Sequence, residues 1–313
     1  MAILLPFQTA SAAGFSTKAK GTTSANFLKL APGARAIAMG EAYSALTDDS
    51  LALYWNPAGL SYMASRHSVN FMHALYVEEI NFGYAAYAAK LPNNLGSIAT
   101  SVHYLNVGAI DQTDTIGNPI GSYSPKDAAY ALGWGGKFFG LGFGLSGKYI
   151  SSKILNSAST YAADIGVQAR QLFSYEKLTL AATAKNIGPG LKFHQERDPL
   201  PFEFRLGSSY LVVENLPGSD YFTHDSVIAT MDAVFPIDNE PYGAFGLEHA
   251  KIFGDIPVAG RLGFNSRSWG DLSGFSGVSL GFGTIYKNLT VDYTLAPLGE
   301  LGLTHRMSVG YAF

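Results

Sequence analysis

The sequence predicts an all-β protein, a transmembrane antiparallel β-barrel of about fourteen strands with an N-terminal plug. Three observations support this fold class. The 313 residues are 47% hydrophobic but only 14% charged, whereas a soluble domain usually carries about 25% charged residues. The sequence contains no uninterrupted run of about 18 apolar residues, the minimum length of a membrane-spanning helix. Short stretches of alternating apolar and polar residues, separated by turn residues, continue from Ser65 to the C-terminus.

The C-terminal stretch Leu303–Phe313 shows the alternation most clearly. One face carries the large side chains, which are Leu303, His305, Met307, Val309, Tyr311 and Phe313. A period of two indicates a β-strand with one apolar side, and a terminal aromatic residue suits the aromatic girdle of a membrane barrel. An edge strand of a soluble sheet is the alternative. We expect Tyr311 and Phe313 to form a C-terminal insertion signal, with membrane lipid and the barrel-assembly machinery as partners.

The strands follow one another through residues 65–313, each near the length of about 9–11 residues that a tilted strand needs to cross a bilayer. They are expected to begin near His67, Ile80, Gly96, Ala128, Gly140, Tyr161, Lys177, Phe202, Ser226, Tyr242, Val258, Gly277, Asn288 and Thr304. Links after even-numbered strands are mostly short, and several links after odd-numbered strands are longer. Barrels have short periplasmic turns and longer outer loops, so this parity places the N-terminal part on the periplasmic side.

The first 64 residues lack the strand pattern. Residues 1–12 have the apolar core and small residues of a secretory signal peptide, without the basic residues that normally precede the core. We expect an incomplete signal peptide there rather than a disordered apolar tail. Residues 13–64 are too few for a hydrophobic core of their own. A barrel of about fourteen strands is too wide for its side chains to fill, so residues 13–64 are expected to be a plug, or hatch, for the barrel of residues 65–313.

The most distinctive local motif is Asn56-Pro57-Ala58-Gly59. Pro57 fixes one backbone dihedral and disfavours helical geometry at Asn56. Ala58 and Gly59 are small enough to lie against a barrel wall, and the amide of Asn56 can bond backbone groups on both sides. These properties suit a tight turn that seals a pore, and a plain helix-ending turn is the alternative.

Charged residues occur on the polar faces of the expected strands. They are Lys148, Asp164, Arg170, Lys185, Glu203, Arg205, Asp232, Arg261, Asp292 and Arg306. A charge that faces lipid at mid-bilayer costs about 2–4 kcal/mol, so we expect these side chains to face the lumen. There they would hold the plug against the wall, with Arg35 and Glu41 as partners on the plug. A ligand-binding role for these charges is the alternative.

No catalytic or metal-binding pattern stands out. The seven histidines are dispersed, and no nucleophile accompanies a base in a recognisable arrangement. Residues 111–118 lack the spacing of a calcium loop, and the glycines of residues 135–144 lack the helix and lysine of a phosphate loop. We therefore expect no enzyme activity, metal or cofactor. The net charge of −3 argues against nucleic acid as a partner.

Three stretches resemble a known family. Asn56–Leu60, preceded by Trp55, resembles the plug motif of FadL-like outer-membrane proteins, and both Phe27–Tyr43 and Pro297–Phe313 are similar to the PorV/PorQ branch of that superfamily. The resemblance implies a barrel of about fourteen strands in the bacterial outer membrane, with a plug on its periplasmic side.

The resemblance also implies two alternative functions. PorV-type relatives serve type IX secretion and hold exported proteins near the translocon, whereas FadL-like relatives pass hydrophobic compounds through a lateral opening. We expect the first function, a non-enzymatic barrel in protein export or surface attachment, with secreted proteins or a secretion translocon as partners. The alternative is a channel for the uptake of hydrophobic small molecules.

Overall fold

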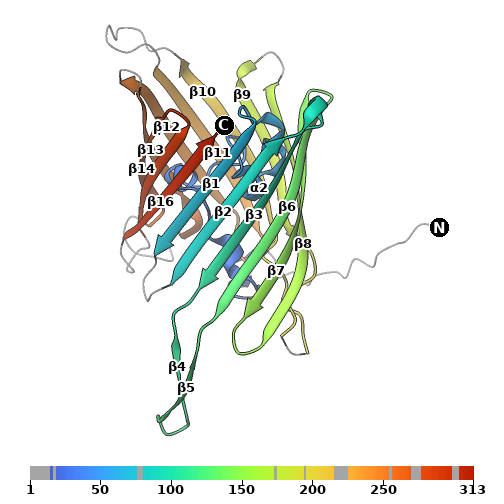
Figure 1. Cartoon of the computed structure of the whole chain (residues 1–313), viewed down its shortest axis with the longest axis vertical. Helices are drawn as coiled ribbons and strands as arrows, with labels where there is room; N and C mark the ends of the chain where they lie inside the picture. Colours follow the sequence, from blue (N-terminus) through green and yellow to red (C-terminus); the bar gives the residue numbers. More distant parts are fainter. Residues whose placement is uncertain are drawn as a thin grey trace, which may run out of the picture.

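The computed structural model describes residues 15–16, 19–75, 80–172, 175–193, 195–214, 225–253, 256–268, 276–297 and 303–313. The expected signal peptide lies outside the described residues. A closed barrel of antiparallel strands makes up most of the described chain (Figure 1). None of the described helices is both long and apolar enough to cross a membrane.

Fourteen of the described strands close into one barrel, which confirms the predicted fold class. They are β1 (His67–Leu75), β2 (Asn81–Lys90), β3 (Ser97–Asn106), β6 (Lys126–Phe138), β7 (Leu141–Lys153), β8 (Ser157–Leu172), β9 (Tyr175–Ile187), β10 (Glu203–Glu214), β11 (Asp225–Pro236), β12 (Tyr242–Phe253), β13 (Ile256–Asn265), β14 (Val278–Tyr286), β15 (Leu289–Pro297) and β16 (Leu303–Ala312). The expected length was wrong for β6 to β9, which contain 13 to 16 residues. These strands keep pairing with their neighbours at the lower end of the barrel in Figure 1.

The first and last strands close the barrel. β1 pairs with β16 from Ser68 opposite Ala312 to Ala74 opposite Arg306. Beyond this ladder, the amide of His67 donates to the carbonyl of Phe313 at 2.7 Å, and the amide of Phe313 donates to the carbonyl of His67 at 3.0 Å. The two rings stack with centroids 4.8 Å apart. The C-terminal residue is therefore bonded into the wall, and β1 and β16 present no free edge to lipid.

The two faces of the strands differ as the alternation predicts. On β7 and β8, Leu145 is 54% exposed and Tyr161 is 67% exposed on the outer face, whereas Asp164 and Gln168 are fully buried on the inner face. The outer face is apolar because it meets lipid, and polar groups turn inward where they can find partners.

Several links at one end of the barrel are much longer than the tight turns at the other, although residues 154–156 form a short link among the longer ones and residues 215–224 a long link among the short ones. At the end that carries Phe313, residues 139–140 join β6 to β7 and residues 287–288 join β14 to β15; this end is called the turn end. At the opposite end, residues 107–125 and 188–202 form much longer links, and this end is called the loop end. Short turns face the periplasm and longer loops face outward in barrels of this kind.

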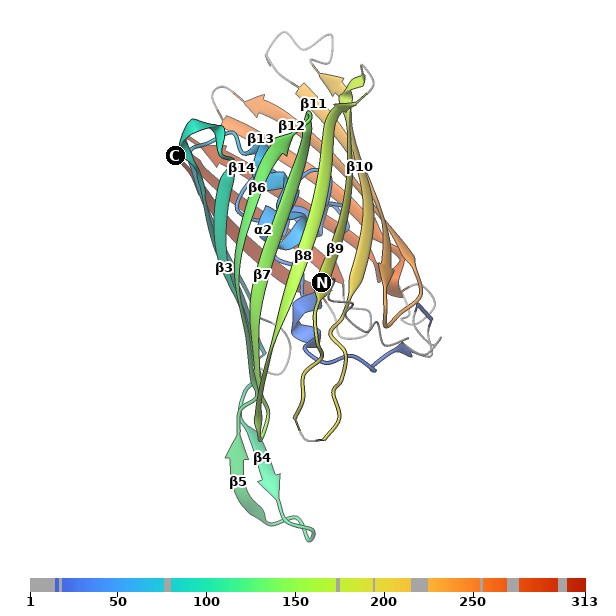
Figure 2. The ribbon, with the colours of Figure 1, turned by 90° about the vertical axis from the view of Figure 1, so that its right-hand side faces the viewer.

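A hairpin at the loop end was not predicted from the sequence, which indicated only a long link between the strands expected to begin near Gly96 and Ala128. Strands β4 (Ile110–Thr113) and β5 (Pro119–Tyr123) form a separate two-stranded sheet that projects beyond the barrel (Figures 1 and 2). Asp114 accepts hydrogen bonds from the amides of Ile116 and Asn118 at its tip, both at 2.9 Å. Bonds from Asn118 hold the pKa of Asp114 below its usual value.

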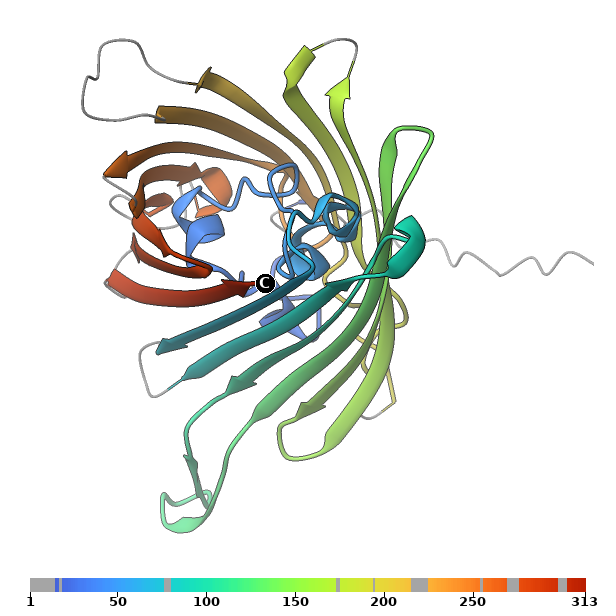
Figure 3. The same cartoon turned by 45° about the horizontal axis from the view of Figure 1, so that its top comes forward.

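The N-terminal segment, which denotes the described part of residues 13–64, lies inside the barrel (Figure 3). Its helices are the 3-10 helix η2 (Asn26–Lys29), α1 (Ala34–Ala38), α2 (Ala52–Trp55) and the 3-10 helix η3 (Pro57–Tyr62). Two further 3-10 helices, η4 (Pro92–Asn94) and η5 (Ser266–Ser268), lie in links between strands. The main hydrophobic cluster joins Trp55, which is fully buried, to Met72 and Phe82 of the wall. The core of the molecule is thus the contact between segment and wall.

The sequence predicted that this segment lies inside the barrel or on its periplasmic side; the structure places it inside, with its start at the loop end and not on the periplasmic side. The segment runs through the lumen from one end of the barrel to the other. Near its start, the amide of Ser24 donates to the carbonyl of Pro199 in the loop-end link 188–202, at 2.8 Å. Near its end, Tyr62 donates to the carbonyl of Gln168 at 3.1 Å, toward the turn end of β8. The alternation of short and long links indicates at which end of the barrel β1 begins. It carries no information about how far the residues before β1 extend into the lumen.

Candidate functional site

The Asn56–Gly59 motif forms a buried turn against β8. The backbone of Asn56 is extended, with φ −164° and ψ 107°, so α2 ends there and η3 begins at Pro57. The Oδ1 atom of Asn56 accepts from the amide of Ala58 at 3.1 Å. Its Nδ2 atom donates to the carbonyls of Ser44 at 3.1 Å and Val167 at 3.3 Å. One amide side chain thereby joins two parts of the segment to the barrel wall.

Glycines in the wall leave the space that this turn occupies. A Cβ atom on Gly144 of β7 would lie 2.1 Å from the carbonyl carbon of Pro57, and one on Gly166 of β8 would lie 2.0 Å from Oδ1 of Asn56. A Cβ atom on Gly135 of β6 would lie 2.7 Å from the carbonyl oxygen of Pro57. Glycine in a strand allows this close backbone approach. In the sequence, the glycines of residues 135–144 are indistinguishable from ordinary strand glycines, so this role was not predicted.

A second group of wall glycines receives the end of α1. A Cβ atom on Gly263 of β13 would lie 2.0 Å from the amide nitrogen of Gly40, and one on Gly281 of β14 would lie 2.5 Å from the Cβ atom of Ala38. Gly40 itself has φ +65°, a left-handed conformation that favours glycine. The segment therefore meets glycine-lined wall on two sides of the barrel.

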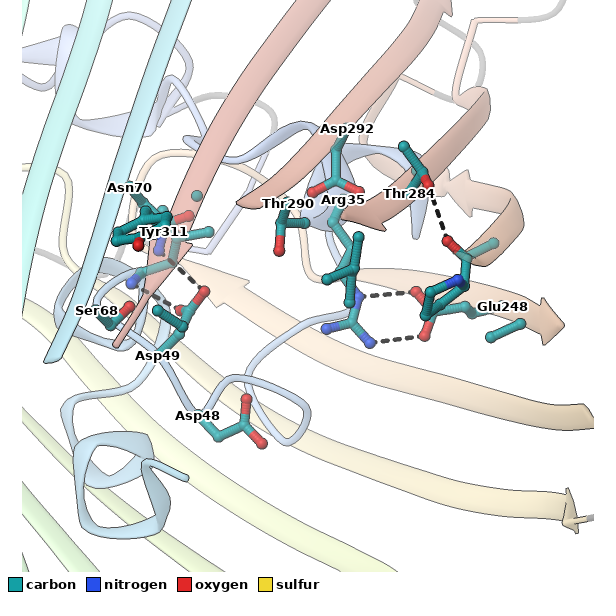
Figure 4. Close-up of a pocket in the computed structure, with 18 of the residues that line it drawn as sticks. Arg35, Asp48, Asp49, Ser68, Asn70, Glu248, Thr284, Thr290, Asp292 and Tyr311 are labelled. Carbon is teal, nitrogen blue, oxygen red and sulfur yellow. Dashed lines mark hydrogen bonds and ion pairs between the residues drawn. The ribbon is translucent and has the colours of Figure 1, made fainter. Parts of the chain in front are cut away.

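A chain of ion pairs fixes α1 to the wall at Glu248 of β12. Arg35 donates to both carboxylate oxygens of Glu248, from Nε at 2.8 Å and from Nη2 at 2.6 Å (Figure 4). Arg261 of β13 donates to the same carboxylate at 2.6 Å and to Asp292 of β15 at 2.7 Å. Glu248 is 4% exposed, and bidentate charge-assisted bonds of this kind are strong and directional.

A second charged group surrounds Glu41 toward the loop end. Arg267 bonds the carboxylate of Glu41, and Arg205 of β10 donates to the carbonyl of Glu41 at 2.8 Å. Arg205 also donates to Glu203 at 2.6 Å and lies 5.2 Å from the ring centroid of Trp55. Glu41 has φ +69°, an uncommon conformation for this residue type. The bonds to both arginines hold the backbone there.

The other predicted lumen charges form two sets, those that contact the N-terminal segment and those that pair with another residue of the wall. Arg170 faces Asp48 of the segment at 3.3 Å, and Asp232 accepts from the amide of Ser44 at 3.2 Å. Lys185 lies 3.9 Å from the ring centroid of Tyr54. In contrast, Lys148 and Asp164 form a pair within the wall at 2.8 Å.

Arg306 completes the set of predicted charges. It is 7% exposed and lines a loop-end cavity of about 190 Å³. Three charged partners could not be recognised in the sequence: Asp48 of the segment, Glu248 of β12 and Arg267 of η5. Alternation shows which face a strand residue is on, but not which segment and wall residues lie opposite each other.

Two cavities lie at opposite ends of the N-terminal segment. The turn-end cavity has a volume of about 410 Å³ and is lined by Arg35, Asp49 and Asn70 among others (Figure 4). A second loop-end cavity, of about 220 Å³ and distinct from the one beside Arg306, is lined by Lys29 and Tyr242 among others, and it shares no lining residue with the turn-end cavity. Within the described residues, no group of three His, Cys, Asp or Glu side chains could hold a metal ion.

The ionisation of Asp49 should make the stability of the contact between the N-terminal segment and the wall depend on pH. Burial and the neighbouring Asp48 carboxylate raise the pKa of Asp49 from 3.8 to about 6. Because the folded protein holds the proton of Asp49 more tightly than the unfolded chain does, protonated Asp49 contributes to the free energy of unfolding. This contribution is fully present below pH 3.8 and is lost as the pH rises through about 6. We expect Asp49→Asn to have the wild-type unfolding temperature at low pH and a higher one at neutral pH. Heat-modifiable gel migration across this pH range measures the difference, and a lower unfolding temperature of the variant at neutral pH would contradict the assignment.

Comparison with known proteins adds to this geometry. Residues 15–216 match the family described as type IX secretion system protein PorV. The toluene transporter TodX of Pseudomonas putida has a similar fold, with TM-score 0.55 and 11% identity over 90% of this chain and 96% of TodX. The CymD monoaromatic hydrocarbon channel has TM-score 0.53 and 11% identity over 90% of this chain and 97% of CymD.

No curated protein matches the sequence. Identities this low to the two solved channels show a shared fold alone. The family match covers more than half of the chain, and it includes the N-terminal segment and the hairpin β4–β5. The protein is an outer-membrane β-barrel that belongs to the PorV family of type IX secretion system proteins.

Proposed function

We propose that this barrel binds partner proteins in a type IX secretion system and has no enzymatic activity. The family match over residues 15–216 carries the proposal. The position of the N-terminal segment supports it, because the segment lies between a turn-end cavity of about 410 Å³ and a loop-end cavity of about 220 Å³ that share no lining residue. The hairpin β4–β5 supports it as well, since Ile116 is 82% exposed and Ile120 is 65% exposed beyond the barrel. Single exposed apolar side chains are ordinary, but Ile110, Ile116 and Ile120 are all exposed on this one small hairpin, and exposed apolar side chains gathered on one element favour an interaction site.

Deletion of the gene should leave exported proteins in the periplasm and off the cell surface. The full-length chain should restore their surface display. A variant with Ile116→Ser and Ile120→Ser should reach the membrane in heat-modifiable form but restore display poorly, because its partner surface is lost. The matched control is Phe139→Ser, which changes a fully exposed apolar residue at the turn end. Surface proteolysis of exported proteins measures the effect, and unchanged display in the deletion strain would contradict the proposal.

A second candidate function is uptake of hydrophobic small molecules. The fold that this chain shares with TodX and CymD favours it. In that case the deletion strain would grow slowly on toluene or a related hydrocarbon while its exported proteins reached the surface normally. The same strain therefore separates the two functions.

We also propose that the N-terminal segment is a plug and that the end of β16 is the signal for membrane insertion. Tyr311 and Phe313 support the second role, because both rings are about half exposed at the turn end and pack at 5.4 Å. Deletion of Phe313 should lower the amount of heat-modifiable barrel in outer-membrane fractions. Changing Phe253, an exposed aromatic residue on β12, to Ala is the control. Equal losses in both variants would assign the effect to exposed aromatic residues in general.

A further inference from the structure

The amino end of the N-terminal segment is built into the loop-end rim. The amide of Phe15 donates to the carbonyl of Ile237 at 2.9 Å. The hydroxyl of Ser24 donates to the carbonyl of Asp198 at 2.8 Å. Ile237 belongs to the link between β11 and β12, and Asp198 belongs to the link between β9 and β10. Figure 2 shows the first described residues, in dark blue, on the side of the barrel away from the C-terminus.

One buried carboxylate, Asp238, holds this end of the segment. It accepts from the hydroxyl of Thr23 at 2.5 Å and bonds the ammonium group of Lys29. Asp238 is 3% exposed, and Thr23 is 6% exposed. Between these two partners, Ala25 has φ +50°, which is an unfavourable conformation for alanine. A strained residue between two bonds to one carboxylate indicates that Asp238 imposes the local shape.

The opposite end of the segment is attached differently. It continues covalently into β1 at the turn end, and the Asn56–Gly59 turn packs there against glycines whose space a side chain would fill. The loop-end attachment consists of non-covalent bonds, both backbone bonds such as that of Phe15 to Ile237 and the side-chain bonds of Asp238, whereas the turn-end attachment includes the covalent chain itself. If the segment is released, its amino end must therefore leave first, toward the loop end.

We infer that the segment is a strap whose amino end is displayed at the cell surface and held there by Asp238. The inference goes beyond the proposed function, and it holds whether the barrel serves secretion or uptake. It follows from the loop-end position of residues 15–16 and 19–29 together with the outward orientation of the longer links in outer-membrane barrels. A partner outside the cell could then reach this end of the segment directly.

Cysteine accessibility tests the topology, because the chain contains no cysteine. In intact cells, a maleimide that cannot cross the outer membrane should label Thr22→Cys on the segment. Ile116→Cys, at the hairpin tip, is the positive control. Phe139→Cys, in a turn-end link, should be labelled only after the outer membrane is permeabilised. If Thr22→Cys behaves like Phe139→Cys while Ile116→Cys is labelled, the amino end faces the periplasm and the inference is wrong.

A second comparison tests the role of Asp238. Leu28 is 4% exposed, so Leu28→Cys should react slowly in the wild-type background. Adding Asp238→Ala should raise its labelling rate about tenfold or more, the factor expected when at least one charge-assisted bond is lost. Adding Lys29→Ala and Thr23→Ala instead, which leaves Asp238 in place, should have a similar effect.

The control is Asp225→Ala, which removes another buried carboxylate at the turn-end start of β11, the strand that precedes the link carrying Asp238. Heat-modifiable migration confirms that each barrel is folded before labelling. Equal labelling rates with and without the Asp238→Ala substitution, in folded barrels, would overturn the role of this carboxylate. If Asp225→Ala raised the labelling rate of Leu28→Cys equally, the role of Asp238 would be overturned as well, because loss of any buried carboxylate would then loosen the segment.

Discussion

Replacing Gly144 with valine is expected to displace the Asn56–Gly59 turn and to make the barrel leak small solutes. The first side-chain atom alone would lie 2.1 Å from the carbonyl carbon of Pro57 and 2.2 Å from the amide nitrogen of Ala58. These are backbone atoms of a buried turn, so no rotation of a side chain can relieve the overlap. Overpacking a well-packed site costs about 1–3 kcal/mol and occasionally more. Because the displaced atoms belong to the segment and not to the wall, the barrel should stay closed.

Gly147→Val is the matched control for this prediction. It lies on the same strand, and a Cβ atom there would meet nothing within 4 Å. Both variants replace a glycine of β7 with valine, so they change the strand propensity of β7 in the same way. They differ in that only the side chain at position 144 meets the Asn56–Gly59 turn. Swelling of liposomes in sucrose or another small solute measures the leak, and heat-modifiable migration reports the barrel. A sealed Gly144→Val barrel would show that the turn only connects α2 to η3.

The positions of the strands could be predicted from the sequence because the signals are local. Alternation and turn residues place the starts of β1, β12 and β16 at or next to the expected residues. The Asn56–Gly59 turn was recognisable for the same reason, since Pro57 constrains its own neighbours. The C-terminal strand could be read in full because every second residue is large and apolar.

The contacts between segment and wall could not be predicted, because they depend on register. Glu248 and Arg261 face each other across β12 and β13, and Arg35 reaches them only because α1 lies at that height in the lumen. Alternation places Gly144 on the inner face of β7 and Gly147 on the outer face, but only the position of the segment shows that Gly144 meets Pro57. The hairpin β4–β5 was missed because its strands have four and five residues, too few for an alternation to be seen.

Glu248→Gln is expected to loosen α1 from the wall more than any other single change of a charge on the segment or its wall. Glu248 receives both bonds from Arg35 and one from Arg261, so its loss leaves two guanidinium groups near an uncharged amide. The side chain of Arg261 is only 5% exposed, and water cannot replace the lost carboxylate easily. Removing one partner of a buried ion pair costs about 3–5 kcal/mol. Asp292 still bonds Arg261 in this variant, so the contacts between the wall strands should remain while the ion pair between Arg35 and the wall is lost.

Arg170→Ala provides the contrast, because it also breaks an ion pair between segment and wall. Its pair with Asp48 is longer, at 3.3 Å, and the two side chains are 29% and 41% exposed. Exposed pairs contribute about 0–1 kcal/mol, so this variant should unfold close to wild type in urea, whereas Glu248→Gln should unfold at clearly lower urea. Arg35→Met should reproduce most of the effect of Glu248→Gln, and the double variant should add little to either, because the residues act as one unit. Equal midpoints for Glu248→Gln and Arg170→Ala would show that α1 is held by its glycine-lined contact, with the ion pairs contributing little.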